Sequence, residues 1–178
     1  MTRVWAENAT LSIDRAARRE FGVVRDILNE GATELKSRLG PGHWDRLVSE
    51  RDVEATTRGR EIYVVRCGGD AVATIALSST GQGFWPHNSW EDPDASALCV
   101  YGLAVRPAWQ RRGIGSWTMR AAEIIADNYA FGYVRLDAYA ADTRSNVFYR
   151  SLGYHMRSTV TVNRVPLNCY EKRVPAAQ

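Results

Sequence analysis

The sequence has little of what disulfide-stapled or metal-bound proteins need. Its three cysteines, Cys67, Cys99 and Cys169, are odd in number, widely scattered and free of any Cys-x-x-Cys spacing. This pattern predicts reduced thiols in strands or the core, not a disulfide framework or a zinc site. The three histidines also lack metal-ligand spacing, so no metal is expected.

The chain also lacks the features that mark membrane proteins and nucleic-acid-binding proteins. No apolar run approaches the roughly 18 residues of a membrane span, and the first residues lack the apolar stretch of a secretory signal. The net charge is only +3, from 23 Lys and Arg against 20 Asp and Glu, and no basic block exceeds three residues. We therefore expect a cytoplasmic protein that binds neither membranes nor nucleic acids.

What remains is the composition of an ordinary globular protein. Apolar residues make up 45% of the chain and charged residues 24%, and no repeat, linker or low-complexity tract divides it. A chain of 178 residues is long enough to bury one substantial core. We expect a single domain over residues 1–178, with its core at about 9–174.

The first part of the chain is mainly helical in pattern. A short strand is expected to end at residues 11–13. From Asp14, a plausible N-cap, apolar residues such as Phe21 and Val24 recur at three- and four-residue spacing towards Leu39. Gly40-Pro41-Gly42 then predicts the end of this helix, and a weaker helix is expected at residues 47–57.

From residue 61 onward the pattern changes to strands. Residues 61–66 and 71–77 predict a hairpin around Gly68-Gly69-Asp70, and the apolar run at 97–105 is typical of a central strand buried on both faces. A helix through residue 127 and a strand at 133–139 would complete a parallel βαβ unit. A helix at 143–151, stopped by Gly153, and strands at 155–163 and 167–174 follow. The predicted fold class is α/β with a mixed sheet.

The loop Gln110-Arg-Arg-Gly-Ile-Gly115 lies between the central strand and the helix that follows it. Backbone N–H groups at a helix N-terminus lack intrahelical partners, and glycines let a phosphate approach them closely. The loop is not a Walker motif, because no Gly-Lys-Ser/Thr follows. It is not a Rossmann fingerprint either, because Thr118 stands where the third glycine is needed. We interpret it as a phosphate-binding loop of another class.

Two motifs give this loop a family resemblance. The run Leu103-Ala-Val-Arg-Pro-Ala-Trp-Gln-Arg-Arg-Gly-Ile-Gly115 resembles the cofactor motif of the GNAT superfamily of N-acetyltransferases. Downstream, Asn146-Val-Phe-Tyr149-Arg-Ser-Leu-Gly153-Tyr154 is similar to that family's second segment. The resemblance implies a GNAT-like fold, in which a mixed, mostly antiparallel sheet with a central parallel pair is flanked by helices. It also implies that the cofactor is acetyl-CoA.

The resemblance further implies roles for individual residues. The backbone of Leu103, Ala104 and Val105 would pair with the pantetheine arm and polarise the acetyl carbonyl. Asn146 would hydrogen-bond the pantetheine, and Tyr149 would protonate the departing thiolate. A helix-surface amide and a packing tyrosine are the alternative interpretations of these two side chains. The pyrophosphate would lie against the loop residues Gln110, Arg111, Arg112, Gly113, Ile114, Gly115 and Ser116.

The general base and the acceptor site are less well defined by the sequence. Cys99 stands where several relatives carry a glutamate, and a neutral thiol is a poor base. Glu91 is our candidate base, with His87 as the alternative, because both lie on the acidic and aromatic loop that leads into the central strand. Candidate acceptor-binding residues are Trp44, Trp85, His87 and Tyr101. Asp137 is either a neighbour of the cofactor or a buried, paired carboxylate.

The predicted function is acetyl transfer from acetyl-CoA to a primary amine of a small molecule, by direct attack. Two alternatives stay open: transfer to a protein or peptide N-terminus, and a non-catalytic module that binds CoA and regulates a partner. Because homodimers are common in the family, self-association is also open.

Overall fold

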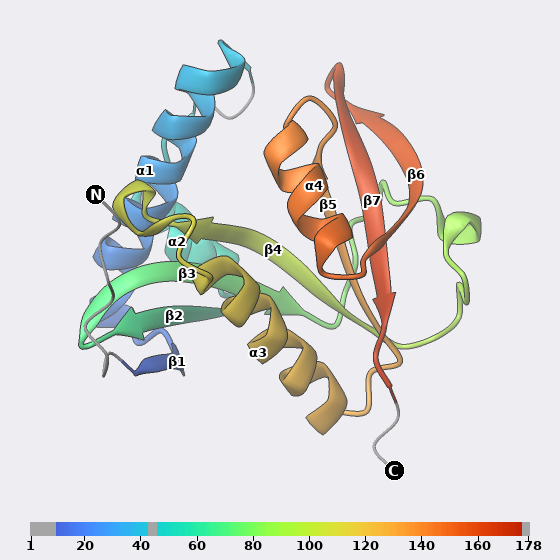
Figure 1. Ribbon diagram of the computed structural model, residues 1–178, viewed down its shortest axis with the longest axis horizontal. Coiled ribbons are helices and arrows are strands. Elements are labelled where there is room, and N and C mark those ends of the chain that lie inside the picture. The colour runs from blue at the N-terminus through green and yellow to red at the C-terminus, as the bar shows by residue number, and fades with distance from the viewer. Residues whose placement is uncertain (1–9, 43–45, 176–178) are drawn as a thin grey trace.

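The computed structural model describes residues 10–42 and 46–175. These residues form one seven-stranded sheet with the strand order β1-β2-β3-β4-β5-β7-β6 (Figure 1). Only β4 and β5 pair in parallel. The mixed, mostly antiparallel sheet with one parallel pair is therefore confirmed. The strands are β1 (Leu11–Arg15), β2 (Glu61–Cys67), β3 (Asp70–Ser78), β4 (Ala97–Val105), β5 (Tyr133–Tyr139), β6 (His155–Val162) and β7 (Val165–Arg173).

The helices cover both faces of the sheet. α1 (Phe21–Leu39) and α2 (Glu50–Thr56) pack over one face, where Val24 and Val53 join a cluster with Tyr101. α3 (Ile114–Asn128) and α4 (Thr143–Ser151) cover the other face, where Met119 and Tyr149 belong to a separate core cluster. The candidate site lies within the sheet between these two helical layers, where β4 and β5 separate.

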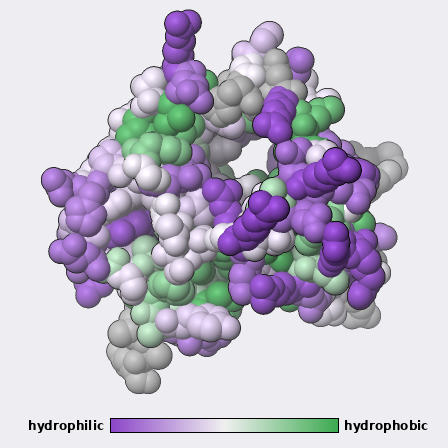
Figure 2. All heavy atoms as spheres, turned by 180° about the vertical axis from the view of Figure 1, so that it is seen from behind, coloured by the Kyte–Doolittle hydropathy of each residue, from purple (hydrophilic) through white to green (hydrophobic). Residues whose placement is uncertain are grey.

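The feature that creates this site is the short pairing between β4 and β5. Their register covers only three residue pairs, from Ala97 opposite Tyr133 to Cys99 opposite Arg135. Beyond Cys99 the two strands diverge, and Figure 1 shows β4 running under α1 while β5 rises towards α4. Figure 2 shows an opening that passes through the molecule between these two halves. The second half of β4 therefore has a side that β5 does not cover.

A bulge in β4 turns the strand away from β5. Thr74 of β3 pairs with Ala104 and Ala76 pairs with Tyr101, so two residues of β4 stand opposite one residue of β3. One of these two residues is Gly102, whose φ of 55° lies in the left-handed region that favours glycine. Bulges bend a strand and increase its twist. This local geometry explains why the parallel pair ends after Cys99.

An ion pair connects the end of α1 to the start of α4, beyond the point where β4 and β5 diverge. Arg38, in the last turn of α1, places its Nη1 2.8 Å from Oδ1 of Asp142, the residue before α4. Ser145 and Arg38 hold the pKa of this carboxyl below its usual range, although its burial acts in the opposite direction. The ion pair fixes α1 relative to α4, and so fixes the width of the opening.

Two boundaries differ from the sequence-based predictions. Asp14 does not cap a helix: it lies in β1 opposite Val64, and α1 begins at Phe21 after a 3₁₀ turn (Arg18–Glu20). Pairing with β2 outweighs the capping preference of the aspartate. The last strand begins at Val165, because Asn163 and the next residue both have positive φ and form a tight two-residue turn. The predicted helix end at Gly40, with φ of 76°, is confirmed.

Candidate active site

The loop before α3 is shaped to receive an anion. Arg111 and Gly113 both have positive φ, 56° and 78°. Alternation of left-handed residues with ordinary ones turns successive backbone N–H groups towards one concave surface. In the part of the chain that the structure describes, no side chain caps the N-terminus of α3. The first N–H groups of the helix, together with the positive end of its dipole, are therefore available to a phosphate.

The two glycines of the loop serve different purposes. A Cβ on Gly113 would meet no atom within 4 Å, so this glycine provides the left-handed turn and an open surface. A Cβ on Gly115 would lie 3.3 Å from Cζ of Phe148 and 3.8 Å from Cγ2 of Val105. Gly115 therefore lets α3 pack closely against both α4 and the end of β4.

The remaining loop residues have distinct positions. The Gln110 side chain donates a hydrogen bond of 3.2 Å to the Val105 carbonyl and so ties the loop to β4. The Arg112 guanidinium lies 5.1 Å from the ring centre of Trp109, and Arg111 is exposed. Ile114 is buried in the core, and Ser116 is half-buried in the first turn of α3. Both arginines stand at the rim of the anion-binding surface.

The predicted pantetheine-binding segment lies at the diverging end of β4. Leu103 packs against the core cluster under α3, and Val105 packs against a neighbouring cluster that includes Ile114. Ala104 faces α1, where a Cβ on Gly31 would lie 3.6 Å from its methyl group. The segment thus runs from the opening between the strands to the anion-binding loop. An extended ligand bound along it would reach both.

Asn146 is the most highly connected polar side chain near the site. Its amide nitrogen donates to the carbonyls of Tyr139 and Asp142, at 2.8 and 2.7 Å. Its amide oxygen accepts from the Asn168 amide and the Tyr170 hydroxyl, at 2.8 and 2.7 Å. An amide has two donors and about two acceptor sites, so a hydrogen bond to pantetheine would have to replace one of these. The network instead fastens α4 to β5 and β7.

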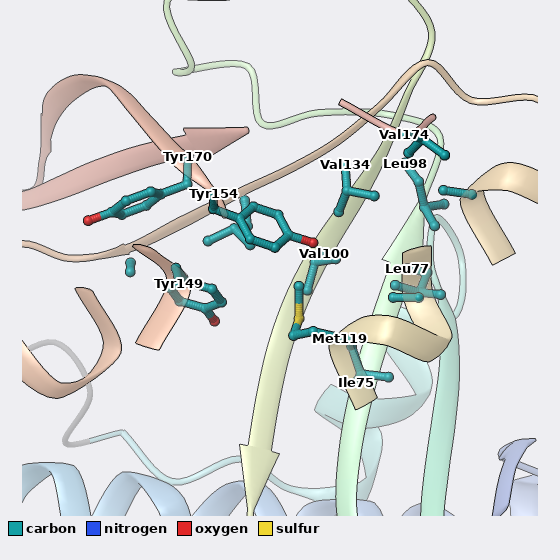
Figure 3. Close-up of a cluster of buried hydrophobic side chains, with 14 residues drawn as sticks. Ile75, Leu77, Leu98, Val100, Met119, Val134, Tyr149, Tyr154, Tyr170 and Val174 are labelled. Atoms are coloured by element: carbon teal, nitrogen blue, oxygen red, sulfur yellow. The ribbon is translucent and has the colours of Figure 1, made fainter. Parts of the chain in front are cut away.

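Tyr149 lies in a cluster of aromatic rings beside Asn146. Its ring centre is 6.0 Å from that of Tyr154 and 5.8 Å from that of Tyr170 (Figure 3). Figure 3 shows the Tyr149 hydroxyl directed away from the other two. Among the described residues, the recorded contacts of Tyr149 are with rings, and none hydrogen-bonds its hydroxyl. Burial raises the pKa of this hydroxyl, and the negative charge of Asp137 raises it further. The proton therefore stays on Tyr149 at neutral pH, ready to be donated.

Asp137 is a carboxylate on the part of β5 that has diverged from β4. Nε1 of Trp85 donates to its Oδ2 at 2.9 Å. Its charge helps to raise the pKa of the hydroxyls of Tyr101, Tyr139 and Tyr149, after the larger effect of burial on each. The sequence signal for Asp137 was its place near the carboxyl end of a β-strand, where ligands of α/β sheets bind.

Two predicted acceptor residues come together beside Asp137. The rings of Trp85 and Tyr101 are stacked, with centres 6.0 Å apart and an angle of 10° between their planes. The Tyr101 hydroxyl donates to the Thr80 carbonyl at 2.7 Å, which fixes its ring. On the side of Trp85 towards the start of β4 lies a cavity of about 310 Å³, which is also lined by His87, Trp90 and Cys99. Trp44 lies outside the described residues.

Glu91 and His87 lie on the loop before β4, and His87 lines the same cavity as Trp85. Glu91 is ion-paired with Arg157, and Tyr133 at the start of β5 donates to it at 3.4 Å. Tyr133 is four residues from Asp137, or roughly 13 Å along a strand. His87 is exposed in a 3₁₀ turn (His87–Ser89), with its Nε2 3.5 Å from Asp94. Burial raises the pKa of the Cys99 thiol to about 11, which disfavours a thiolate nucleophile there.

The family model described as the acetyltransferase (GNAT) domain matches residues 58–156, more than half of the sequence. The chain belongs to the GNAT acetyltransferase family. The enzyme is thus an N-acetyltransferase that uses acetyl-CoA as its donor. No curated protein matches the chain in sequence.

Solved structures share the fold at low sequence identity. A GNAT-family acetyltransferase from Streptococcus agalactiae has a TM-score of 0.77 at 15% identity, over 93% of this chain and 98% of that one. A structure from Salmonella typhimurium that contains the cofactor acetyl-CoA has a TM-score of 0.66 at 17% identity, over 94% and 95%. The ribosomal-protein-S18-alanine N-acetyltransferase from Escherichia coli has a TM-score of 0.69 at 12% identity, over 95% and 97%. These similarities establish the GNAT fold.

The described residues show neither a metal site nor a membrane-spanning helix. They contain no group of three or more His, Cys, Asp or Glu side chains arranged to hold a metal ion. None of their helices is both long and apolar enough to span a bilayer.

The loop geometry makes a prediction for CoA binding. Gly113→Asp should weaken it about 100-fold, because the new carboxylate would stand beside the pyrophosphate. Gly113→Asn is the matched control, since asparagine has nearly the same size and tolerates a positive φ. It should bind CoA far more tightly than the aspartate variant. Isothermal titration calorimetry with CoA measures both, and unchanged binding by Gly113→Asp would contradict the assignment of this loop.

Proposed function

We propose that the enzyme acetylates a primary amine of a small molecule by direct attack, with Asp137 as general base and Tyr149 as general acid. The observation that carries this proposal is the placement of the two side chains. Asp137 lies on β5 beyond its last pair with β4, and Tyr149 lies on α4, which the Asn146 side chain joins to the end of β5. One carboxylate and one protonated phenol at the same opening provide the two proton transfers that amide formation needs.

The need for a base follows from the chemistry of the acceptor. An alkylammonium group has a pKa near 10.4, so the neutral amine is about 4–5 kcal/mol less stable than its ammonium form at pH 7. A carboxylate that accepts the proton lowers the barrier. Asp137 replaces Glu91 in this proposal, because Glu91 pairs with Arg157 beside the start of β5. Asp137 lies farther along the same strand, beyond the point where β4 leaves it.

The donor half of the reaction relies on the backbone and on Tyr149. The pyrophosphate binds at the N-terminus of α3, and the pantetheine arm runs along Leu103 to Val105. Backbone N–H groups of this segment stabilise the negative charge that develops on the acetyl oxygen. Tyr149 then donates its proton to the thiolate of CoA as the bond to the acetyl carbon breaks. We assign Asn146 the task of positioning α4, and hence Tyr149, through its four principal hydrogen bonds.

The surface around Asp137 supports a cationic small molecule as acceptor. The stacked Trp85 and Tyr101 rings support the carboxylate, which is the negative charge that an ammonium group would approach. Direct attack is favoured over a covalent route, because the raised pKa keeps the Cys99 thiol protonated. A peptide N-terminus is the second candidate, because one protein with the same fold is the ribosomal-protein-S18-alanine N-acetyltransferase from Escherichia coli.

A panel of acceptors tests the proposed function. Purified enzyme with acetyl-CoA should release free CoA when given one or more small primary amines, and should release little with peptides that carry free N-termini. The release is followed with a thiol reagent, and the acetylated product is verified by mass spectrometry. Preferential turnover of peptides would transfer the function to the second candidate. CoA binding without turnover of any acceptor would indicate a regulatory module.

The role of Tyr149 predicts a selective loss of rate. Tyr149→Phe should lower kcat by about 10²- to 10³-fold, the range expected for a lost general acid, and leave the KM for acetyl-CoA nearly unchanged. Tyr154→Phe is the control. Its hydroxyl donates to Glu123 at 3.0 Å, so this change should lower stability but not kcat. Equal kcat values for the Tyr149 variant and the wild type would leave Tyr149 with a packing role alone.

The two carboxylates can be distinguished in the same assay. Asp137→Asn should lower kcat by about 10²-fold or more, because it removes the proton acceptor but retains a partner for Trp85. Glu91→Gln should stay within about 2-fold of the wild-type kcat, with a lower unfolding temperature from the lost Arg157 ion pair. The opposite pattern would return the role of base to Glu91.

A further inference from the structure

Arg60 differs from the other arginines that are removed from solvent. Leaving the cofactor loop aside, six described arginines are half-buried or buried besides Arg60, and each of them forms an ion pair with a carboxylate: Arg25, Arg38, Arg66, Arg106, Arg135 and Arg157. Arg60 is also half-buried, but no described carboxylate lies within ion-pair distance of it. Its guanidinium instead lies 3.8 Å from the ring centre of Tyr101. This contact stabilises the charge of the guanidinium but leaves its N–H groups able to bind an anion.

The position of Arg60 relates it to the acceptor wall. Arg60 precedes β2 and reaches the Tyr101 ring on β4, which is stacked against Trp85. Trp85 in turn donates its indole N–H to Asp137 at 2.9 Å. The charges of Arg60 and Asp137 both act on the Tyr101 hydroxyl, in opposite directions. A cation and a carboxylate thus stand at the two ends of one row of aromatic rings.

A site with this charge pattern is complementary to a molecule that carries both signs of charge. The amine of the acceptor would approach Asp137, where it reacts. A carboxylate or phosphate on the same molecule would approach Arg60, whose planar guanidinium offers paired donors to either group. The carbon chain between these two groups would pass along the edges of the stacked rings. A neutral or doubly cationic acceptor would leave Arg60 without its anionic partner.

We propose that Arg60 is a specificity-determining residue that binds an anionic group of the acceptor, so that the substrate is a small amino-carboxylate or amino-phosphate. This inference rests on the proposed function, because it takes the amine to be acetylated beside Asp137. It narrows the acceptor from any primary amine to one with a negative charge at its other end. It gives Arg60 no part in the chemical step.

Matched acceptors test the inference. Each pair shares one carbon chain and differs in its anionic group: an ω-amino carboxylate against the amino alcohol of the same length, and ethanolamine phosphate against ethanolamine. Wild-type enzyme should favour the anionic member of a pair by about 10- to 100-fold in kcat/KM, the range of one charged hydrogen-bonding interaction. Chains of two to six carbons show which length spans the site. A peptide with an acidic second residue, compared with its amide, tests a peptide source of the same charge.

Substitutions identify Arg60 as the cause. Arg60→Gln should remove the preference by lowering kcat/KM for the anionic member 10- to 100-fold, while the neutral member and the KM for acetyl-CoA stay the same. Arg60→Lys, which keeps the charge without the planar group, should retain part of the preference. Arg58→Gln is the matched control, since Arg58 is exposed two residues away. An equal fall for both members of a pair, or no preference in the wild type, would overturn the inference.

A binding measurement separates this inference from the proposed function. Glutarate and inorganic phosphate carry the anionic group without an amine, and calorimetry with the CoA-bound enzyme measures their binding. Binding of these anions by the wild type that is lost in Arg60→Gln supports the anion site. If no amine is turned over in that case, only the proposed function fails. The absence of binding by both probes, together with no preference among acceptors, overturns the anion site. Thermal unfolding of each variant shows whether it is folded.

Discussion

The limited pairing between β4 and β5 is the constraint on which the rest of this structure depends. Three residue pairs hold the two strands in parallel, and the bulge at Gly102 then bends β4 away from its neighbour. The break leaves one side of β4 uncovered in the middle of an otherwise continuous sheet. It also places the start of α3, the end of β5 and the ring of Tyr149 around one opening. A regular pair of strands would bring the same residues together without leaving space for a ligand.

Around this opening, the distribution of charge fits the reaction that we propose. The uncapped N-terminus of α3 provides partial positive charge for the pyrophosphate, and it comes from the backbone instead of a lysine side chain. Burial keeps the Tyr149 proton in place, and Asp137 supplies negative charge on β5. The ion pair between Arg38 and Asp142 holds the two layers together across the gap. The donor side of the site is thus mainly backbone, while the acceptor side is mainly side chains.

The difference between a site made of backbone and a site made of side chains explains which features could be predicted from the sequence. Local patterns predicted most helices and strands to within a few residues, because a β-turn glycine or an apolar period acts over short distances. The prediction of Asp14 as a helix cap was wrong, because pairing with Val64, fifty residues away, keeps it in a strand. The sequence favours Glu91 as base and leaves two roles open for Asp137, because the choice depends on which carboxylate faces the opening. No local pattern contains that information.

The sequence by itself determined the family, the sheet with its parallel pair and the acetyl-CoA donor, because each rests on a contiguous motif or on periodicity along the chain. The tertiary structure alone decided which side chains meet at the proposed acceptor site. Arg60, Tyr101, Trp85 and Asp137 come from four separate segments and meet only when β2, β4, β5 and the loop before β4 have folded together. The physical reason is that the donor binds to a backbone shape encoded locally, whereas the acceptor site is assembled from contacts between distant parts of the chain.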